Sequence, residues 1–274
     1  MTLREACTDA ADKVDGIIRK ILKTPEDEKL DDRSVHDIRT SVRRFQSAYR
    51  VLPKKAKQKK SFQRYMDACT DLFKLLSEAR DYDVILFRLS KYSESKALID
   101  AKSSITKKRE NLLKRVHKKA LAIKRSSKKL NFQGVSESQL EKRFKARLEK
   151  QARKTRDDLL VVWTGKAKKA QIHGLRKDCK KLRYTLELDE KKYEKQMELM
   201  KEWQGYLGTV HDVEMTQNLL RKKNKRGELD SIIRSEEEKS KESYETFMTK
   251  SRTEETRAMI EALFLREKKR QAIG

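Results

Sequence analysis

Residues that interrupt helices are scarce in this sequence. Only two of its 274 residues are proline and only eight are glycine. Aromatic residues make up 7% and the whole hydrophobic set 36%, which is a small share for a folded chain. The apolar residues nevertheless recur at helical spacing, which argues against disorder. Few helix breakers and narrow apolar stripes together predict long helices that each bury one face.

Cysteine is also scarce, and Cys7, Cys69 and Cys179 lie far apart. An odd number at these spacings argues against a disulfide framework and a zinc motif. Each cysteine falls in an apolar stripe, so we expect all three in the core. No apolar run approaches the length of a membrane span, and the N-terminal segment lacks the apolar centre of a signal sequence. We therefore expect a cytoplasmic protein.

Acidic residues are too few to balance the basic ones. Lys and Arg number 69 and Asp and Glu 43, which gives a formal net charge of +26. Adaptation to heat adds charges of both signs and does not require such an excess. The excess therefore predicts a polyanionic partner, and charge alone leaves nucleic acid, an anionic membrane and a polyphosphate open.

The pattern of apolar residues predicts helices separated by short breaks. The segment NFQGVSES, residues 131–138, is the best internal boundary because Asn, Gly and Ser lie there between two charged helical stretches. No segment alternates with a period of two, so we expect an all-α protein without a sheet. Ser34, Asp81 and Asp212 are the expected N-caps of their helices. The expected helices are residues 3–23, 35–52, 57–77, 81–92, 94–128, 137–166, 171–188, 191–206, 212–225 and 228–270.

Two pairs of segments recur in the same order in both halves of the chain. VHDIRTSVRRF at 35–45 is similar to IHGLRKDCKKL at 172–182, with a histidine ahead of basic residues in each. LLSEARDYDV at 75–84 is similar to YLGTVHDVEM at 206–215. This order predicts two copies of one helical unit within a single domain, 1–274. We place the two copies at residues 1–130 and 137–274.

Each histidine-led helix has an apolar face and an adjoining basic face, at about 100° per residue. Like charges at helical spacing repel by a few tenths of a kcal/mol per pair. Asp37 and Asp178 lie elsewhere on the wheel, so we expect that they do not neutralise the basic face. An anion along the basic face relieves this repulsion, since an Arg fork grips two phosphate oxygens at once. A single charged face is usually only solvated, but two equivalent faces favour a ligand. The basic faces and their edges comprise His36, Arg39, Arg43, Arg44 and Arg50 in the first copy, and His173, Arg176, Lys180, Lys181, Arg183 and Tyr184 in the second.

The chemistry expected of these faces is binding. A histidine beside an apolar stripe is usually a packed residue, but His36 and His173 occupy equivalent places, and a polyanion favours their charged form. No Gly-rich phosphate loop, nucleophile motif or metal-ligand cluster accompanies them, so we expect no enzyme, metal or cofactor. A nucleic-acid-binding protein is one alternative, although the basic faces lack interleaved aromatic residues apart from Tyr184. A phosphohydrolase is another, although it needs a carboxylate or metal partner. The basic stretch 105–129 either lines the same site or only extends a positive surface.

These motifs resemble the CHAD family, the conserved histidine α-helical domains. The resemblance rests on the doubled histidine motif, on HGLRKDCKKLRY in particular and on the two segments that follow, and it covers essentially the whole chain. It implies two pseudo-symmetric bundles of the four-helix type with a basic central cavity or groove between them. It also implies binding of linear inorganic polyphosphate, with nucleic acid as a competing polyanion and without a membrane partner. Polyphosphate granules in the cytoplasm are the setting that such binding suggests. The residues that the resemblance implies as ligands are His36, Arg39, Arg43, Arg44, His173, Arg176, Lys177, Lys180, Lys181, Arg183 and Tyr184.

Overall fold

The computed structural model of this protein describes residues 1–25, 30–127, 130–224 and 226–271, with the side chains of 264–271 excepted. Helices and their connections account for all of the described residues, which confirms the all-α prediction. None of these helices combines the length and apolar character that crossing a lipid bilayer requires. The elements are α1 (Leu3–Ile21), α2 (Asp32–Val51), α3 (Lys54–Lys57), α4 (Lys60–Leu89), α5 (Lys96–Leu113), α6 (Val116–Ser127), α7 (Glu137–Trp163), α8 (Lys169–Leu186), η1 (Glu187–Asp189), α9 (Glu190–Lys223), α10 (Asp230–Ser251) and α11 (Glu254–Gln271).

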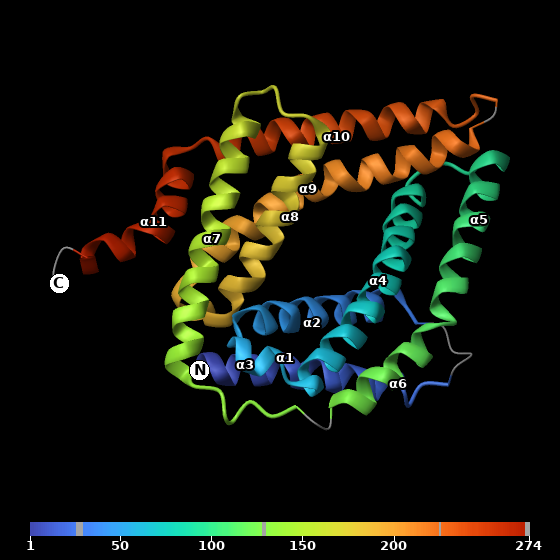
Figure 1. Ribbon diagram of the computed structural model, residues 1–274. Helices are drawn as coiled ribbons and strands as arrows, with labels where there is room; N and C mark the ends of the chain where they lie inside the picture. Colours follow the sequence, from blue (N-terminus) through green and yellow to red (C-terminus); the bar gives the residue numbers. More distant parts are fainter. Residues whose placement is uncertain (26–29, 128–129, 225, 272–274) are drawn as a thin grey trace.

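The helices form a four-sided frame (Figure 1). Helix pairs α1 and α2, α7 and α8, α9 and α10, and α4 and α5 make its four sides. In the first half α1 packs on α2, α2 on α4 and α4 on α5. In the second half α7 packs on α8, α8 on α9 and α9 on α10 in the same order. This order is compatible with two copies of one helical unit.

Two helices are longer than the sequence suggested. Helix α4 continues through Asp81 and α9 continues through Asp212, so the prediction that these aspartates cap new helices is wrong. Apolar residues of α4 are buried on both sides of Asp81, among them Leu76 and Ile85, and no proline interrupts the run. Apolar packing on both sides of Asp81 therefore keeps α4 continuous, and each aspartate lies inside a helix.

Other helix ends also differ from the predictions. Helix α2 begins at Asp32, and the Asp31 side chain accepts a hydrogen bond from the Ser34 backbone N–H at 2.7 Å, so Asp31 rather than Ser34 is the N-cap. The expected helix 94–128 is divided into α5 and α6, and residue 128 lies outside the described residues. Because α5 packs on α4 whereas α6 packs on both α4 and α1, the division lets the chain turn around α4. The expected final helix is likewise divided, into α10 and α11.

One apolar core extends through both halves and joins α2 to α8. The side chains of Cys7, Cys69 and Cys179 are completely buried in it, as expected. Helices α2 and α8 pack against each other as well as against α1 and α7. The predicted apolar faces are buried in this core, through Val35, Ile38, Val42 and Phe45 of α2 and Leu175, Cys179, Leu182 and Leu186 of α8.

A second apolar cluster joins α4 and α5 to α9 and α10 at the opposite corner of the frame. Its buried members are Ile85, Leu89, Leu98, Ile105, Leu220, Leu229, Ile232 and Ile233. Beside it Arg88 of α4 forms an ion pair with Glu236 of α10, whose carboxylate also accepts a hydrogen bond from Tyr92 at 2.6 Å. The frame is thus held by apolar contacts at two opposite corners.

The Glu236 carboxylate is the polar anchor of this corner, and its side chain is 1% exposed. Replacing Glu236 by Ala leaves the partly buried Arg88 without its buried partner, so we expect the free energy of unfolding to fall by about 3–5 kcal/mol. Glu238→Ala, an exposed change on the same helix, serves as the control and is expected to stay within about 0.5 kcal/mol. Urea denaturation measures both, and equal midpoints for the two variants would contradict the anchoring role.

Candidate functional site

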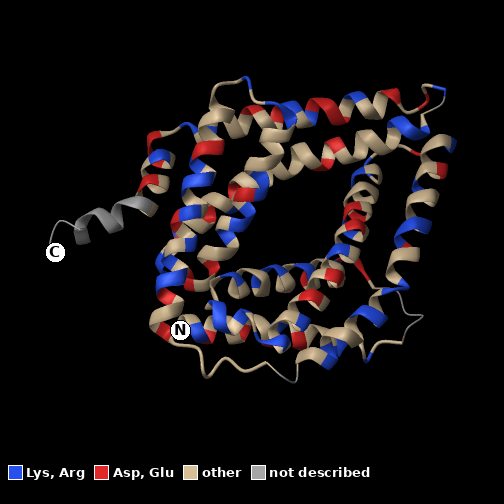
Figure 2. Ribbon diagram, in the orientation of Figure 1, with Lys and Arg blue, Asp and Glu red and all other residues tan. Residues whose placement is uncertain are grey.

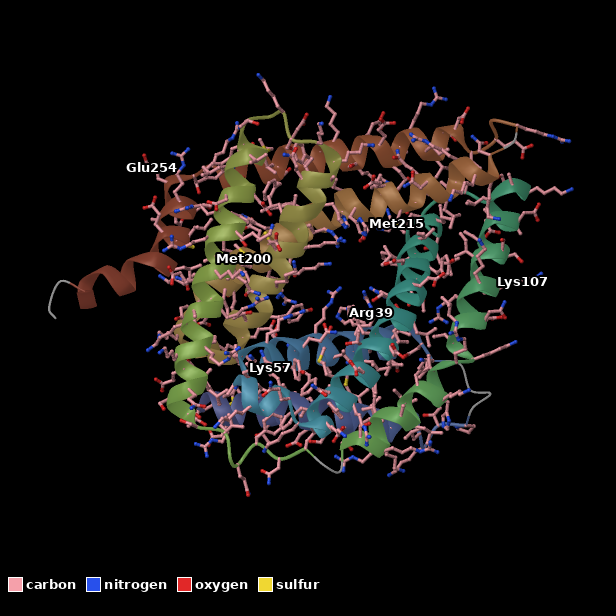
Figure 3. The ribbon with its side chains drawn as sticks, viewed as in Figure 1. Arg39, Lys57, Lys107, Met200, Met215 and Glu254 are labelled. Carbon is pink, nitrogen blue, oxygen red and sulfur yellow. The ribbon has the colours of Figure 1, made fainter. Side chains whose placement is uncertain are left out.

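Four basic side chains meet where α2 packs against α8. Arg39 and Arg43 come from α2, and Arg176 and Lys180 come from α8. Each acts electrostatically on members of the other helix, since the charge of Arg43 lowers the pKa values of both Arg176 and Lys180. Arg39 lies on the inner side of the frame in Figure 3. We call this group the central cationic cluster, and it unites four of the predicted ligands from the two halves.

Burial and mutual repulsion weaken the charges of this cluster. Burial, followed by the charges of Arg176 and Arg43, lowers the pKa of Lys180 to about 7. Burial and the charge of Arg43 lower the pKa of Arg39 to about 10. Arg176 is 9% exposed, and burial is the main reason that its pKa is lowered too. Lys180 is therefore close to half charged at neutral pH, while the arginines stay charged.

The guanidinium groups of the cluster are oriented by aromatic contacts. Arg39 and Arg43 lie over the ring of Phe73, at 5.5 and 5.0 Å from its centroid. Arg39 Nη2 donates a long hydrogen bond of 3.5 Å to Ser77 Oγ. The Nε atoms of Arg39 and Arg176 are buried and have no hydrogen-bond partner. Buried donors without acceptors cost about 1–3 kcal/mol each, so an oxyanion that supplies acceptors here is strongly favoured.

Two carboxylates face the cluster from the opposite sides of the frame. Asp81 of α4 acts electrostatically on Arg39, and Asp212 of α9 acts on Lys180 and Arg176. Burial raises the pKa of both carboxylates, because it outweighs the lowering effect of these cations. The repeated sequence motif includes both aspartates, but the prediction treated them as helix caps and not as carboxylates that face the cluster. Among the described residues, no three His, Cys, Asp or Glu side chains come together as a metal site.

The two predicted histidines lie at the edge of the cluster. His36 is exposed near the start of α2, and burial and the charge of Arg80 lower its pKa. His173 of α8 is partly buried, and burial and the charge of Lys177 lower its pKa. Both imidazoles are therefore uncharged at neutral pH in the free protein. Arg80 of α4, which the repeat aligned with His211, is a basic neighbour that the predicted ligand set omitted.

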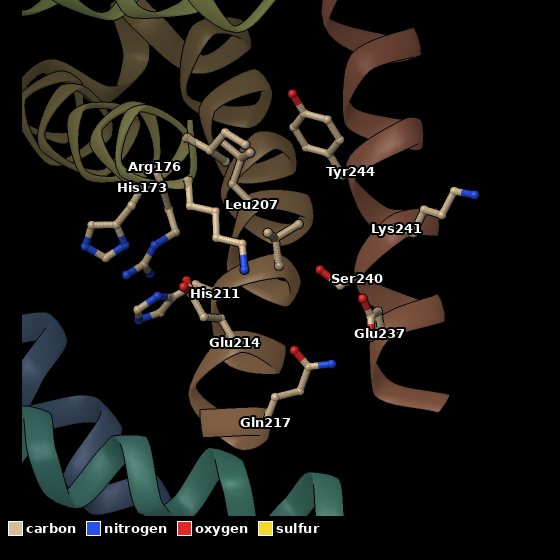
Figure 4. A pocket seen from close by; sticks show the side chains of 13 residues that line it. His173, Arg176, Leu207, His211, Glu214, Gln217, Glu237, Ser240, Lys241 and Tyr244 are labelled. Carbon is tan, nitrogen blue, oxygen red and sulfur yellow. The ribbon is translucent and has the colours of Figure 1, made fainter. Parts of the chain in front are cut away.

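A cavity of about 340 Å³ opens beside His173, between α8, α9 and α10. Figure 4 shows the Arg176 guanidinium beside the rings of His173 and His211 at one end of this cavity. The two rings are 4.8 Å apart, and burial and the charge of Arg176 lower the pKa of His211 to about 3. Glu214 and Glu237 line the other part of the cavity. Lys169 and Lys241 also line the cavity, so its wall carries charges of both signs.

Three other predicted ligands are held by carboxylates. Glu187 of η1 accepts from Arg44 Nε at 2.9 Å and lies 3.2 Å from Arg183 Nη1. Lys181 Nζ donates to Asp178 Oδ1 at 2.7 Å. The expectation that Asp178 neutralises no part of the basic face is therefore wrong for Lys181, which lies one helical turn away. The structure does not bring Arg44, Arg183 or Lys181 into the central cationic cluster.

The remaining two predicted ligands occupy opposite environments. Tyr184 is 6% exposed, and its ring lies under the guanidinium groups of Arg183 and Arg43, at 4.4 and 5.9 Å. Its ring links the central cationic cluster to the side of Arg44 and Arg183. Lys177 is exposed on α8 beside His173 and is open to solvent.

The basic stretch 105–129 lies away from the cluster. Its Arg109 pairs with Asp83, and its Lys119 pairs with Asp71 at 2.8 Å, so both contact α4. Helices α5 and α6 pack mainly against α4 and α1, and residues 128 and 129 lie outside the described residues. Figure 2 shows Lys and Arg distributed over every side of the frame, so charge at the surface does not by itself mark the site.

Comparison with known proteins identifies the family of this chain and solved structures with a similar fold. The CHAD domain family model matches residues 14–221. Among solved structures, the CHAD domain from the plant Ricinus communis gives a TM-score of 0.58 at 15% sequence identity, covering 96% of this chain and 92% of that one. PptA from Streptomyces chartreusis gives a TM-score of 0.53 at 11% identity, covering 96% of this chain and 98% of that one. A search of curated proteins gave no match. The two structural matches show the fold alone, whereas the family match spans most of the sequence, and this chain belongs to the CHAD domain family.

Proposed function

We propose that the central cationic cluster binds linear inorganic polyphosphate. Membership of the CHAD family supports polyphosphate binding, or a related function, at the level of the family. The observation that carries the proposal is the convergence of Arg39 and Arg43 with Arg176 and Lys180, with buried Nε donors that have no protein acceptor. A linear anion with repeated charge supplies acceptors to both helices at once.

The cations have separate parts in this proposal. Arg39 and Arg176 offer forked donors to two phosphate oxygens each, and Arg43 lies between the two helices. A bound phosphate raises the pKa of Lys180 because it offsets the repulsion by the neighbouring cations, so Lys180 becomes fully charged. His36 and His173 stand at the ends of the cluster and become charged beside the same anion. Lys177 is placed to contact a chain that leaves the cluster past His173.

Binding of nucleic acid is less favoured by the same geometry. Single-strand recognition without sequence preference uses aromatic rings on which bases stack. The rings of Phe73 and Tyr184 near the cluster are already covered by guanidinium groups of Arg39, Arg43 and Arg183. We expect polyphosphate to displace single-stranded RNA from the protein, and the reverse order of affinity would favour the nucleic-acid function. We also propose binding without hydrolysis, so incubation of the protein with polyphosphate and Mg²⁺ should release no phosphate.

The first test of the site is salt dependence. Binding that releases condensed counterions weakens log-linearly with salt, and each lost phosphate contact reduces the slope by about 1. We expect Arg39→Gln or Arg176→Gln to weaken polyphosphate binding and to flatten the slope by that amount. Lys107→Gln, on the exposed surface of α5 (Figure 3), is the matched control and should leave both unchanged. Equal salt slopes for all variants would contradict the assignment of the binding site to the central cationic cluster.

The second test uses the titration of Lys180. Its pKa of about 7 in the free protein rises when an anion binds, so binding takes up a proton above neutral pH. Affinity of the natural sequence should then fall by up to about tenfold per pH unit as pH rises above 7. Lys180→Arg keeps the charge, and we expect it to flatten the profile between pH 7 and 9 and to keep the affinity seen at pH 6. Calorimetric titrations across this range measure both quantities, and an unchanged profile would exclude Lys180.

The third test concerns the histidines. It uses the Lys180→Arg variant as its background, so that the titration of Lys180 does not add to the pH dependence. Because His36 and His173 are uncharged when free and gain protons beside an anion, binding should tighten as pH falls through their bound-state pKa values. The double change His36→Gln, His173→Gln should weaken binding at pH 6, remove the remaining pH dependence between 6 and 8, and leave the melting temperature nearly unchanged. If both rings are only packing groups, the melting temperature falls while the affinity of the folded protein stays the same.

A further inference from the structure

A second group of cations lies at the corner where α2 and α3 meet α7. Arg50 is in the last turn of α2, Lys57 ends α3, and Arg143 and Arg147 belong to α7. All four side chains are partly exposed. Figure 3 shows Lys57 well to one side of Arg39. We call these four residues the corner cluster, and none of them belongs to the central cationic cluster.

The protein holds two members of the corner cluster in fixed orientations. Lys57 Nζ donates to the backbone carbonyl of Arg50 at 2.6 Å and lies 5.6 Å from the ring centroid of Tyr49. The buried Gln151, with its amide oriented to satisfy both ends, accepts from Arg147 Nε and Nη2 at 3.1 Å each. The same amide donates to α8, so the Arg147 fork is held by a contact between α7 and α8 while its other edge stays open.

The charges of the corner cluster are not compensated within the protein. Burial, followed by the charges of Arg143, Arg147 and Arg50, lowers the pKa of Lys57 to about 8. Burial and the charge of Arg147 lower the pKa of Arg50. The Nε atom of Arg143 is buried without a hydrogen-bond partner. The carboxylate that acts on Arg147 is Asp178.

Asp178 is already shared between two other cations. Its Oδ2 accepts from Lys154 Nζ, and its Oδ1 accepts from Lys181 Nζ at 2.7 Å. These bonds hold the carboxylate between α7 and α8, so it contributes little to the corner cluster. The charges of Arg143, Arg147 and Arg50 all act on Lys57, and the charge of Arg147 acts on Arg50, so four cations from three helices lie close together. A multiply charged oxyanion is the ligand that matches them.

We propose that the corner cluster is a separate phosphate-binding site. Its ligand is a phosphate group, either of a short free condensed phosphate or of a polyphosphate chain that continues from the central cationic cluster. Arg50 follows Arg43 by two turns of α2, about 10 Å at the rise of an α-helix, so one phosphate group does not contact both clusters. The Tyr49 ring is covered by the Lys57 ammonium, which leaves no platform for a base. Binding of a short condensed phosphate here does not rest on the proposed function of the central cluster, whereas binding of a continuing chain does.

The first arm of the test uses tripolyphosphate and a protein whose central cluster is disabled by Arg39→Gln and Arg176→Gln. Calorimetry should still show binding of tripolyphosphate. Adding Lys57→Gln, which keeps an N–H donor for the Arg50 carbonyl, should weaken that binding at least tenfold. Lys55→Gln, an exposed change on the same short helix, is the control and should have no effect. Equal affinities for the Lys57 and Lys55 variants would overturn the proposal.

The second arm distinguishes the two sources of phosphate with long-chain polyphosphate and an intact central cluster. If one chain spans both clusters, Lys57→Gln weakens long-chain binding and flattens its salt slope. If the corner takes only short condensed phosphates, Lys57→Gln affects tripolyphosphate alone. Both results support a phosphate site at the corner, and no loss with either probe overturns it. If the Arg39→Gln, Arg176→Gln variant loses long-chain binding but still binds tripolyphosphate, the two sites act independently and both proposals stand.

A proton measurement separates binding at Lys57 from a structural effect. The groups that face its ammonium are Tyr49 and Arg50 of α2 and Arg143 and Arg147 of α7. A bound phosphate raises the pKa of Lys57, so binding of tripolyphosphate at pH 8 takes up protons. Lys57→Arg should preserve binding and remove this uptake, whereas an unchanged uptake would contradict a phosphate at Lys57. If Lys57→Gln lowers the melting temperature, Arg143→Gln replaces it, with the exposed Lys142→Gln as its control.

Discussion

The apolar contact between α2 and α8 determines where the charges of this protein lie. Each helix carries a basic face directly beside its apolar face, so burying the apolar faces together brings the basic faces together as well. Burial of each large apolar side chain contributes about 1.5–3 kcal/mol, whereas each pair of like charges at helical spacing costs a few tenths of a kcal/mol. Packing therefore outweighs repulsion, and the folded protein holds a concentrated positive site that the isolated helices would not form.

The corner where α4 and α5 meet α9 and α10 helps to position two carboxylates that offset part of this positive charge. The second apolar cluster and the ion pair of Arg88 with Glu236 hold α4 against α10. This contact helps to place the middle of α4 and α9, and with them Asp81 and Asp212, across from the basic faces of α2 and α8. The two aspartates offset part of the positive field, and Lys180 releases part of its charge through its lowered pKa. The free protein thus tolerates the cluster, and the polyanion of the proposed function is the partner that restores the charge that folding reduces.

The carboxylates divide the many cations of this chain into groups with different roles. Glu187 holds Arg44 and Arg183, and Asp178 holds Lys154 and Lys181, so these cations are engaged within the protein. The central cationic cluster and the corner cluster are distinguished by having few such partners. A net charge of +26 favours polyanions around the whole molecule, and scarce carboxylate partners mark the two clusters within it. A buried Nε without a hydrogen-bond partner occurs in Arg39, Arg143 and Arg176, and also in the paired Arg183.

The sequence by itself determined the all-α fold, the buried cysteines and the basic faces headed by His36 and His173, because each of these follows from composition or from spacing along one helix. Its excess of basic residues predicts a polyanionic partner. The continuity of α4 and α9 and the pairing of the basic residues were decided by tertiary structure. Arg44 meets Glu187 at a separation of 143 positions, and the corner cluster assembles cations from three helices. Helical periodicity specifies the face on which a side chain lies, but only the packing of distant helices specifies which charge that face meets.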